Sequence, residues 1–356
     1  MRNPLCASIT PPGFRVFVSV FAAGLALTAA SYAGDGVDAA TAVLSPNQAD
    51  EPVAEAFSMD AAVGFLDHAA VTWTRDRKCF TCHTNFLYLM AKPVVAANDP
   101  AHAEVRSALE SLVLERWLDV GPRWDAEVVM AAATLAVDDR LTTGTLADVT
   151  REALDRMWTL QREDGGTNWL KCGWPPMESD DDYGVAVLAL AAGAAPDDYQ
   201  RTATARAGLD RIRRYLAANP PPTLHHEAML VWADSYLEED LLSDEDREKT
   251  IDALLALQKD DGGWSAATLG DWIRADGATQ DTEHSDAYGT AFVTYVLRRS
   301  GIGDDDPRIE RGRAWLRAHQ RVSGRWFSRS LNRDNAHFLS HAASAFAVLA
   351  LADDRP

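Results

Sequence analysis

The chain has 356 residues, and its 53 acidic residues outnumber 34 lysines and arginines to give a formal net charge of −19 at pH 7. A surface this acidic repels nucleic acid and anionic membranes, which excludes both as general partners. Hydrophobic residues make up 47% of the chain, so it can bury a large core.

The first 33 residues predict an export signal. Arg2 and Arg15 precede an apolar run over 16–30, and residues 31–33 (Ser-Tyr-Ala) offer the small side chains that a signal peptidase reads. An uncleaved membrane anchor is the alternative, but it needs about 20 apolar residues. We therefore expect a periplasmic or secreted protein with no stable membrane span, in which residues 34–56 form a flexible leader.

Helical periodicity then recurs in pairs to the end of the chain. One set of helices is amphipathic and charged, expected at 57–73, 103–118, 148–162, 203–217, 247–259 and 307–320. The other set is apolar and rich in alanine, expected at 84–97, 125–137, 183–194, 226–237, 287–299 and 340–351. Small residues suit close packing and charges suit solvent, so six pairs predict an all-α (α/α)6 toroid over 57–356 with an inner and an outer ring. An open superhelical array is the alternative.

A Gln–Trp pattern recurs after two of the charged helices. Gln258 and Gln320 are each followed six residues later by a tryptophan, with glycine between them, and a stretched copy begins at Gln161. This pattern resembles the QW motif of squalene–hopene and oxidosqualene cyclases, which are relatives of the protein prenyltransferases. The resemblance implies a toroid in which these turns hold each outer helix to the next. Those cyclases use two barrels and this chain has one, which disfavours cyclisation of a triterpene.

A narrower similarity is to exported bacterial proteins described as squalene-cyclase-like or as prenyltransferase/squalene-oxidase-repeat proteins. It is carried by the single toroid, by the Cys-x-x-Cys-His-Thr segment over 79–84, and by Gly-Trp-Pro-Pro-Met-Glu-Ser-Asp-Asp over 173–181. That resemblance implies a fold and no particular reaction.

Polar residues stand at the predicted starts of the inner helices. In a toroid the inner helices run parallel, so their N-termini open at one mouth of the ring. The residues expected there are His83, Asp125, Glu178, Asp180, Asp181, Asp182, His225, His226, Glu227, His284, Asp286 and His341. Helix capping explains aspartates at such positions, but it explains histidines poorly because the helix dipole disfavours positive charge at the N-terminus. The pattern therefore predicts a polar site at this mouth.

Three carboxyls at this mouth are candidate catalytic groups. The run over 178–181 resembles the DxDD element of class II cyclases, which implies Asp180 as general acid with Asp181 and Glu178 beside it. Protonating an alkene needs a carboxyl held neutral in an apolar cavity. Glutamate replaces the first aspartate of the element, and a solvated turn or a cation site are the other interpretations of the acidic run.

Cys79, Cys82 and His83 form the Cys-x-x-Cys-His sequence to which c-type haem is attached. If haem is bound, the sixth iron ligand is expected from the same mouth, from His225, His226, His284, His341 or Met177. A second interpretation is zinc held by Cys79, Cys82, Cys172 and a histidine such as His83. A third interpretation is a disulfide between Cys79 and Cys82.

The sequence thus predicts a squalene-cyclase-like toroid that binds haem c or a metal, together with a hydrophobic or isoprenoid ligand, and that has a redox partner. A terpenoid-cyclase-type enzyme is one alternative. The other is a polysaccharide-active enzyme, in which Trp174, Trp272 and Tyr288 stack on sugars and paired carboxylates perform acid–base chemistry.

Overall fold

The computed structural model describes residues 46–353 except residues 78, 98 and 335. The chain divides into two compact units, Met1–Ala42 and Val43–Pro356, and every described residue belongs to the second. The predicted export signal over 1–33 lies outside the described residues and stays a prediction. No helix within the described residues combines the length and the apolar character needed to cross a bilayer.

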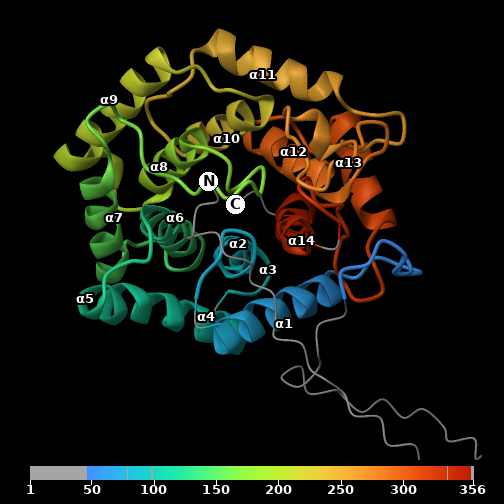
Figure 1. Ribbon diagram of the computed structural model, residues 1–356, viewed down its shortest axis with the longest axis horizontal. Helices are drawn as coiled ribbons and strands as arrows, with labels where there is room; N and C mark the ends of the chain where they lie inside the picture. Colours follow the sequence, from blue (N-terminus) through green and yellow to red (C-terminus); the bar gives the residue numbers. More distant parts are fainter. Residues whose placement is uncertain (1–45, 78, 98, 335, 354–356) are drawn as a thin grey trace, which may run out of the picture. The chain divides into compact units, whose positions relative to one another are not determined.

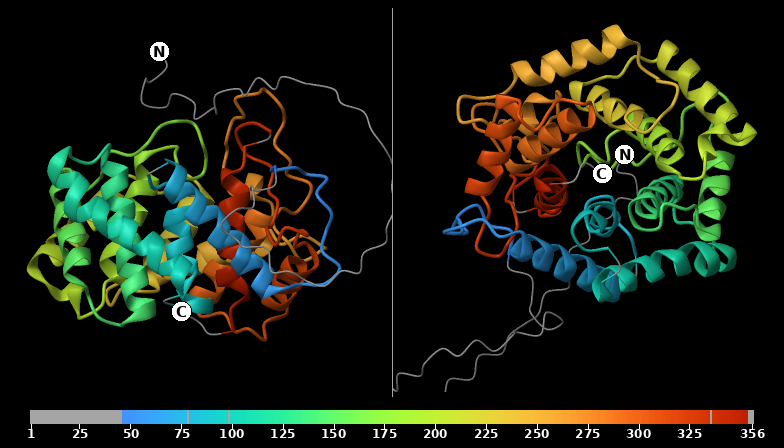
Figure 2. Two further views of the ribbon diagram at one scale, coloured as in Figure 1. Left: turned by 90° about the horizontal axis from the view of Figure 1, so that it is seen from below. Right: turned by 180° about the vertical axis from the view of Figure 1, so that it is seen from behind.

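The described part of the second unit is all-α, and six helical pairs surround a common axis (Figure 1; Figure 2, right). The outer elements are α1 (Met59–Arg77), α4 (Pro100–Ser111) with η2 (Leu112–Arg116) and α5 (Trp117–Asp119), α7 (Asp148–Leu160), α9 (Ala203–Ala218), α11 (Asp244–Ala256) and α13 (Pro307–Ala318). The inner elements are α2 (Asn85–Ala91) with α3 (Pro93–Ala96), α6 (Asp125–Thr142), α8 (Asp181–Ala194), α10 (Leu224–Asp234), α12 (Ala287–Arg299) and α14 (Phe338–Leu351). The predicted toroid is confirmed.

Burial separates the two rings. In the inner helix α8, every residue from Tyr183 to Ala194 is buried, and most of them are alanine, glycine or valine. Such small side chains let neighbouring helices approach on all sides. In the outer helix α7, burial is confined to one stripe, which includes Val149, Ala153 and Met157. The charged face of an outer helix can therefore meet solvent while its stripe packs on the inner ring.

The Gln–Trp turns connect successive outer helices. The side-chain amide of Gln161 donates to the carbonyl oxygen of Gly208 in α9 at 3.1 Å, and that of Gln258 donates to the carbonyl oxygen of Arg308 in α13 at 2.7 Å. Trp264 instead contacts the preceding outer helix, α11, where its indole N–H donates to the carbonyl oxygen of Leu254 at 2.7 Å. The Gln258 turn thus contacts both the helix before it and the helix after it.

The third turn closes the ring. The Gln320 amide donates to the Ser58 carbonyl oxygen at 2.9 Å, and the Ser58 amide donates back to Gln320 Oε1 at 2.8 Å. Ser58 directly precedes α1, so the last outer helix is joined to the first. Contacts between α14 and both α1 and α2 close the inner ring in the same place. This arrangement excludes the open superhelical array.

The described part of the predicted flexible leader, residues 46–56, packs along the closing turn. Val53 pairs with Arg321 in an isolated antiparallel bridge, and the Glu51 carboxylate accepts from Arg325 Nε at 2.6 Å. Arg325 is 2% exposed, and a buried guanidinium requires an anionic partner. Glu51 supplies that partner for Arg325. The flexible leader over 34–56 stays a prediction.

Replacing Gln320 with alanine is expected to lower the free energy of unfolding by about 1–3 kcal/mol, because it leaves the buried polar groups around Ser58 without partners. Urea unfolding followed by circular dichroism measures the change. Alanine at Gln48, an exposed glutamine near the same turn, is the control and should be neutral. Equal stability of the two variants would show that the closing hydrogen bonds contribute nothing.

Candidate functional site

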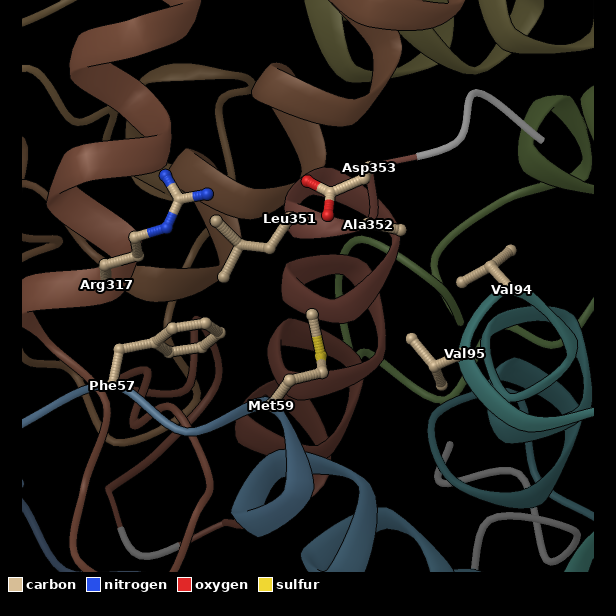
Figure 3. A pocket seen from close by; sticks show the side chains of 8 residues that line it. All are labelled: Phe57, Met59, Val94, Val95, Arg317, Leu351, Ala352 and Asp353. Carbon is tan, nitrogen blue, oxygen red and sulfur yellow. The ribbon is translucent and has the colours of Figure 1, made fainter.

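The two ends of the ring differ in chemistry. We define the mouth as the end formed by the N-terminal ends of α2, α8, α10 and α14 and by the loops over 161–180, 257–286 and 319–337. At the opposite end is a cavity of about 320 Å³ (Figure 3). Its lining residues are Phe57, Met59, Val94, Val95, Arg317, Leu351, Ala352 and Asp353. The cavity contains none of the predicted site residues, which directs attention to the mouth.

Glu178 stands at the end of a tight hairpin in the loop before α8. Its amide donates to the Trp174 carbonyl oxygen at 3.0 Å, and its own carbonyl oxygen accepts from the Gly173 amide at 3.1 Å. Gly173 has a φ of +73°, in the left-handed region that suits this turn. Burial raises the pKa of Glu178 to about 7, because the carboxylate form is poorly solvated there. At neutral pH a large share of this carboxyl therefore carries a proton.

Asp180, two residues later, is the N-cap of α8 and stays ionised. Its carboxylate accepts from the Tyr183 amide at 3.1 Å and is 2.9 Å from His226 Nε2. Burial alone would raise the pKa of Asp180, but His226, Ser179 and the Tyr183 amide stabilise the anion and lower the pKa to about 2. His226 is itself oriented by Thr223 Oγ1, which lies 2.8 Å from its Nδ1.

The next two aspartates are bound to neighbouring side chains. Asp181 is 2.9 Å from both Arg162 and Lys171, and it accepts from the Trp169 amide at 3.0 Å. Asp182 accepts from the Tyr215 hydroxyl at 3.1 Å. The three aspartates of the acidic run therefore have different partners, and Glu178 is the carboxyl whose pKa burial raises to about 7. This arrangement contrasts with the expected assignment of the acid to Asp180.

The three aromatic residues predicted to stack on sugars differ in how much of their surface is exposed. The half-buried Trp174 packs edge-on against Phe338 with ring centroids 4.9 Å apart, and the Arg333 guanidinium lies 4.8 Å from the Trp174 centroid. Trp272 is also half-buried, and its ring centroid is 5.9 Å from that of His225. Tyr288, by contrast, is 1% exposed and packs on Phe292. Of the predicted sugar-stacking residues, Trp174 and Trp272 thus retain exposed surface.

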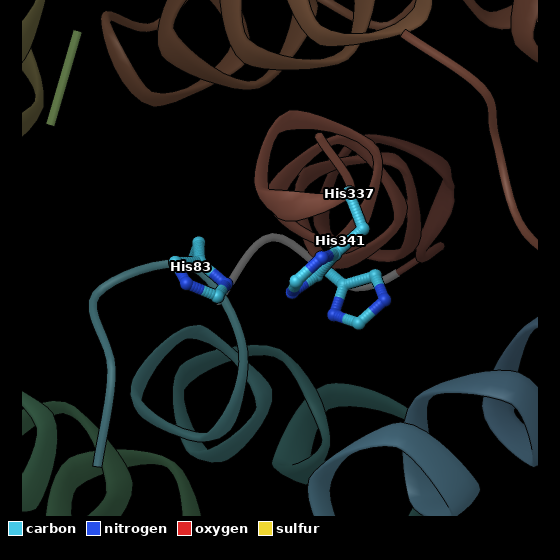
Figure 4. Close-up of side chains that lie close together, drawn as sticks. All are labelled: His83, His337 and His341. Carbon is cyan, nitrogen blue, oxygen red and sulfur yellow. The ribbon is translucent and has the colours of Figure 1, made fainter. Parts of the chain in front are cut away.

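Three imidazoles gather between the first and last inner helices. One ring nitrogen from each of His83, His337 and His341 lies within 4.8 Å of the other two (Figure 4). Thr84 Oγ1 contacts His83 Nδ1 at 2.7 Å and His341 Nδ1 at 3.0 Å. Burial, reinforced by the neighbouring imidazoles, lowers the pKa values of His83 and His341 well below the ordinary histidine value, so both rings are uncharged at neutral pH.

Two of the predicted cysteine ligands, Cys79 and Cys82, shortly precede His83 in the chain, whereas the third, Cys172, is disulfide-bonded. Cys82 is buried, Cys79 is half-buried, and both are free thiols. Burial, with the nearby Glu178 carboxylate, raises the pKa of Cys82 well above the ordinary thiol value. Within the described part of the chain, the only group of three potential ligands that share one position is the histidine cluster, in which His83 is joined by His337 and His341 and by neither thiol. Haem c and cysteine-bound zinc stay predictions.

The remaining predicted ligands are spread apart. His225 is fully buried, 2.8 Å from the Tyr288 hydroxyl, and stacked on Phe292. His284 lies on the long loop before α12, where its side chain is 82% exposed and contacts Asp281. Met177 is buried, and its carbonyl oxygen accepts from the Trp169 indole. These three residues do not meet at one position.

The aspartates predicted at the starts of α6 and α12 have structural partners. Asp286 is the N-cap of α12 and accepts from the Gly289 amide at 3.0 Å. Asp125 accepts from the side-chain amide of Asn168 at 3.0 Å. Capping and loop contacts therefore account for these two residues without a catalytic role.

Sequence reasoning missed His337 and Thr84. His337 stands just before the apolar periodicity of α14, so no helical pattern marked it. One signal was available, because His337 and His341 are four positions apart and hence lie on one face of a helix. Thr84 follows His83 directly, but nothing in the sequence shows that its hydroxyl faces two imidazoles.

Comparisons with known proteins concern the fold. No model of a protein family matches the sequence, and no curated protein matches it. A solved structure described as a possible member of the GH105 family from Klebsiella pneumoniae is 14% identical, with 75% of this chain and 80% of that chain covered and a TM-score of 0.49. A protein from Actinoplanes is 14% identical, with 81% of this chain and 98% of that chain covered and a TM-score of 0.48. A possible GH105 member from Salmonella enterica is 13% identical, with 82% of this chain and 81% of that chain covered and a TM-score of 0.33.

The resemblance to terpenoid cyclases and prenyltransferases is corrected by these findings. Of the three solved structures named above, two are described as possible GH105 members and none as a cyclase. The Gln–Trp turns are accounted for by the contacts that connect the outer helices. The expected squalene-cyclase-like function is corrected together with the resemblance on which it was built, whereas the haem, the metal and the hydrophobic ligand stay predictions.

Proposed function

We propose that the protein is a glycan-active enzyme that hydrolyses a glycosidic bond at the mouth, with Glu178 as general acid and Asp180 as the carboxylate that stabilises positive charge. The observation that carries this proposal is the placement of the two groups. A half-buried carboxyl and a carboxylate paired with His226 stand two residues apart, beside the partly exposed ring of Trp174.

The two carboxyls match the needs of glycoside hydrolysis. The leaving oxygen must receive a proton as its bond breaks, and the sugar ring develops positive charge in the transition state. Water then adds to the sugar carbon, and its proton passes to the Glu178 carboxylate, which restores the acid. Glu178, with a pKa of about 7, is partly protonated at neutral pH, whereas Asp180, with a pKa of about 2, stays negative. Two carboxyls whose environments separate their pKa values can divide the roles of acid and anion between them.

The aromatic surface supplies a place for the sugar. Sugar rings present C–H faces that pack on aromatic rings, and Trp174 is fixed in position by Phe338. Because Glu178 and Trp174 are paired through their backbones, the acid and the stacking ring belong to one small hairpin. A sugar stacked on Trp174 would then lie next to the Glu178 carboxyl.

The test is turnover of a panel of neutral and acidic oligosaccharides by the full chain. The Glu178→Gln variant is expected to lose about 10²- to 10⁴-fold in kcat, because an amide cannot donate the proton. Asp182→Asn is the matched control, because Asp182 belongs to the same acidic run but binds Tyr215, and its activity should stay within a few-fold of the wild type. Full activity in Glu178→Gln, or no turnover of any oligosaccharide, would contradict the proposal.

The pH profile follows from the same two groups. The rate should fall as pH rises through about 7, when Glu178 loses its proton, and should show no acidic limb until Asp180 is protonated near 2 or the protein unfolds. Stability offers a measurement that needs no substrate. Since burial raises the pKa of Glu178 from 4.5 to about 7, its effect on stability becomes unfavourable as pH rises through that window. Glu178→Gln is therefore expected to be more stable than the wild type at pH 8, by about 2–3 kcal/mol.

A further inference from the structure

The histidine cluster lies where the ring closes. His337 is the N-cap of α14 and His341 is in its first turn, so the two share one face of the last inner helix. His83 comes from the segment just before α2, the first inner helix, and Figure 4 shows it facing that pair. The cluster therefore joins the two ends of the helical array at the level of the mouth.

The contacts of the three rings leave nitrogens available. His337 Nε2 is buried and has no hydrogen-bond partner among the described residues. Thr84 Oγ1 contacts the Nδ1 atoms of the other two rings, and a hydroxyl oxygen can accept from two N–H groups. When both Nδ1 atoms carry the proton, His83 and His341 each keep a lone pair on Nε2. Thr84 then orients the rings in the way that outer hydrogen-bond partners orient metal-bound histidines.

We infer that His83, His337 and His341 bind a divalent transition-metal ion, with zinc as the ion that their chemistry suits best. Imidazole nitrogen is a preferred ligand of zinc, copper and nickel. A tetrahedral zinc ion with bonds of about 2.0–2.1 Å places its ligands about 3.4 Å apart. Three nitrogens within 4.8 Å of one another reach that spacing through small rotations of the side chains.

The surroundings favour an ion with one open coordination position. Trp73 packs on both His83 and His337, with ring centroids 5.4 and 5.6 Å away, and Phe65 packs on His341. These rings exclude water from one side of the cluster and hold the imidazoles in place. Three protein ligands are the number found in catalytic rather than structural zinc sites, in which the fourth position holds water or substrate.

Nearby positive charge does not prevent binding. The positive charge of Arg325 contributes to lowering the pKa of His341, but the Arg325 guanidinium is paired with the Glu51 carboxylate. The positive charge of Arg77 likewise contributes to lowering the pKa of His337. The Arg77 guanidinium carbon lies 5.6 Å from the centroid of the Trp73 ring. The proposed site shares His83 with the cysteine-based set predicted from the sequence, but its other two ligands come from α14. It is also independent of the proposed glycan chemistry, because no step there involves these rings.

The experiment is a metal titration of the full chain after a chelator has removed bound ions. Cobalt(II), which reports its ligands by visible absorption, should bind at one ion per chain without a sulfur-to-cobalt charge-transfer band, and zinc should displace it. His337→Ala is expected to weaken zinc binding by more than about 100-fold, and Thr84→Val by about 10-fold. The controls are His284→Ala, which removes an exposed histidine, and Cys82→Ser, and both should leave the affinity unchanged.

His337 is the preferred ligand to replace because it is half-buried at a helix start, whereas His341 is packed in the core. Circular dichroism of the variant establishes that it is folded. Absence of cobalt binding, or unchanged affinity in His337→Ala, overturns the proposal. A charge-transfer band that disappears in Cys82→Ser also overturns it, in favour of the cysteine-based set. None of these outcomes depends on glycan turnover.

Discussion

Alanine at Gly324 is expected to lower the free energy of unfolding by more than about 4 kcal/mol, a loss seen only where a substitution meets a specific obstacle. Gly324 has a φ of +88°, and an added Cβ would lie 2.0 Å from the Ala61 carbonyl oxygen. The left-handed backbone alone costs about 1–2 kcal/mol for a residue with a side chain. The rest arises because the closing turn must move away from α1. Urea unfolding of the purified variant measures the total loss of stability from the backbone strain and from the displaced turn.

Gly301→Ala separates the two contributions. Gly301 has a similar φ of +98°, but no atom lies within 4 Å of the position that its Cβ would take. Its replacement should therefore cost only the backbone strain, about 1–2 kcal/mol. Equal losses for Gly301→Ala and Gly324→Ala would show that the approach to α1 has no energetic weight, and that ring closure does not depend on it.

Removing the carboxylate of Asp138 is expected to destabilise the protein by about 3–5 kcal/mol. Asp138 lies near the end of α6, is 2.5 Å from His102 Nε2 and also accepts from Arg106, and both of those residues come from α4. Asp138→Ala leaves the buried His102 without its acceptor and removes one of the three carboxylates that Arg106 contacts. Thermal or urea unfolding gives the difference in stability between the variant and the wild type.

A surface ion pair between α1 and α4 is the control. Glu104 in α4 pairs with Arg75 at 2.6 Å, but both side chains are more than a third exposed. Solvent screens such pairs, so Glu104→Ala should cost no more than about 1 kcal/mol. If Asp138→Ala proves as mild as Glu104→Ala, the α4–α6 contact is held by apolar packing rather than by its charges.

Helix positions could be predicted because period and composition act locally. The expected helices over 203–217 and 287–299 agree with α9 and α12 to within one residue. The expected helix over 84–97 was less accurate, because α2 ends at Ala91 and a separate short helix begins at Pro93. Proline lacks the N–H that a continuous helix would use at this point.

The candidate site could be predicted only in part. The rule that parallel inner helices open at one end placed Glu178, Asp180 and His226 correctly at the mouth. It could not show that His226 contacts Asp180 while His225 is buried, because adjacent residues on a helix point in directions about 100° apart. Burial decides which carboxyl keeps its proton, and burial depends on the loops over 161–180 and 319–337. Their course is set by tertiary contacts that no local pattern encodes.

The contact between Gln320 and Ser58 joins residues 262 positions apart in the sequence. Such a contact can form only after nearly the whole chain has been synthesised, and bringing its two halves together carries a large loop-closure entropy. Until then α2 lacks α14 as its neighbour, and its apolar flank is exposed to water. Interactions of this sequence separation slow folding. The late assembly of this toroid is therefore the stage at which a molecular chaperone would have most to protect.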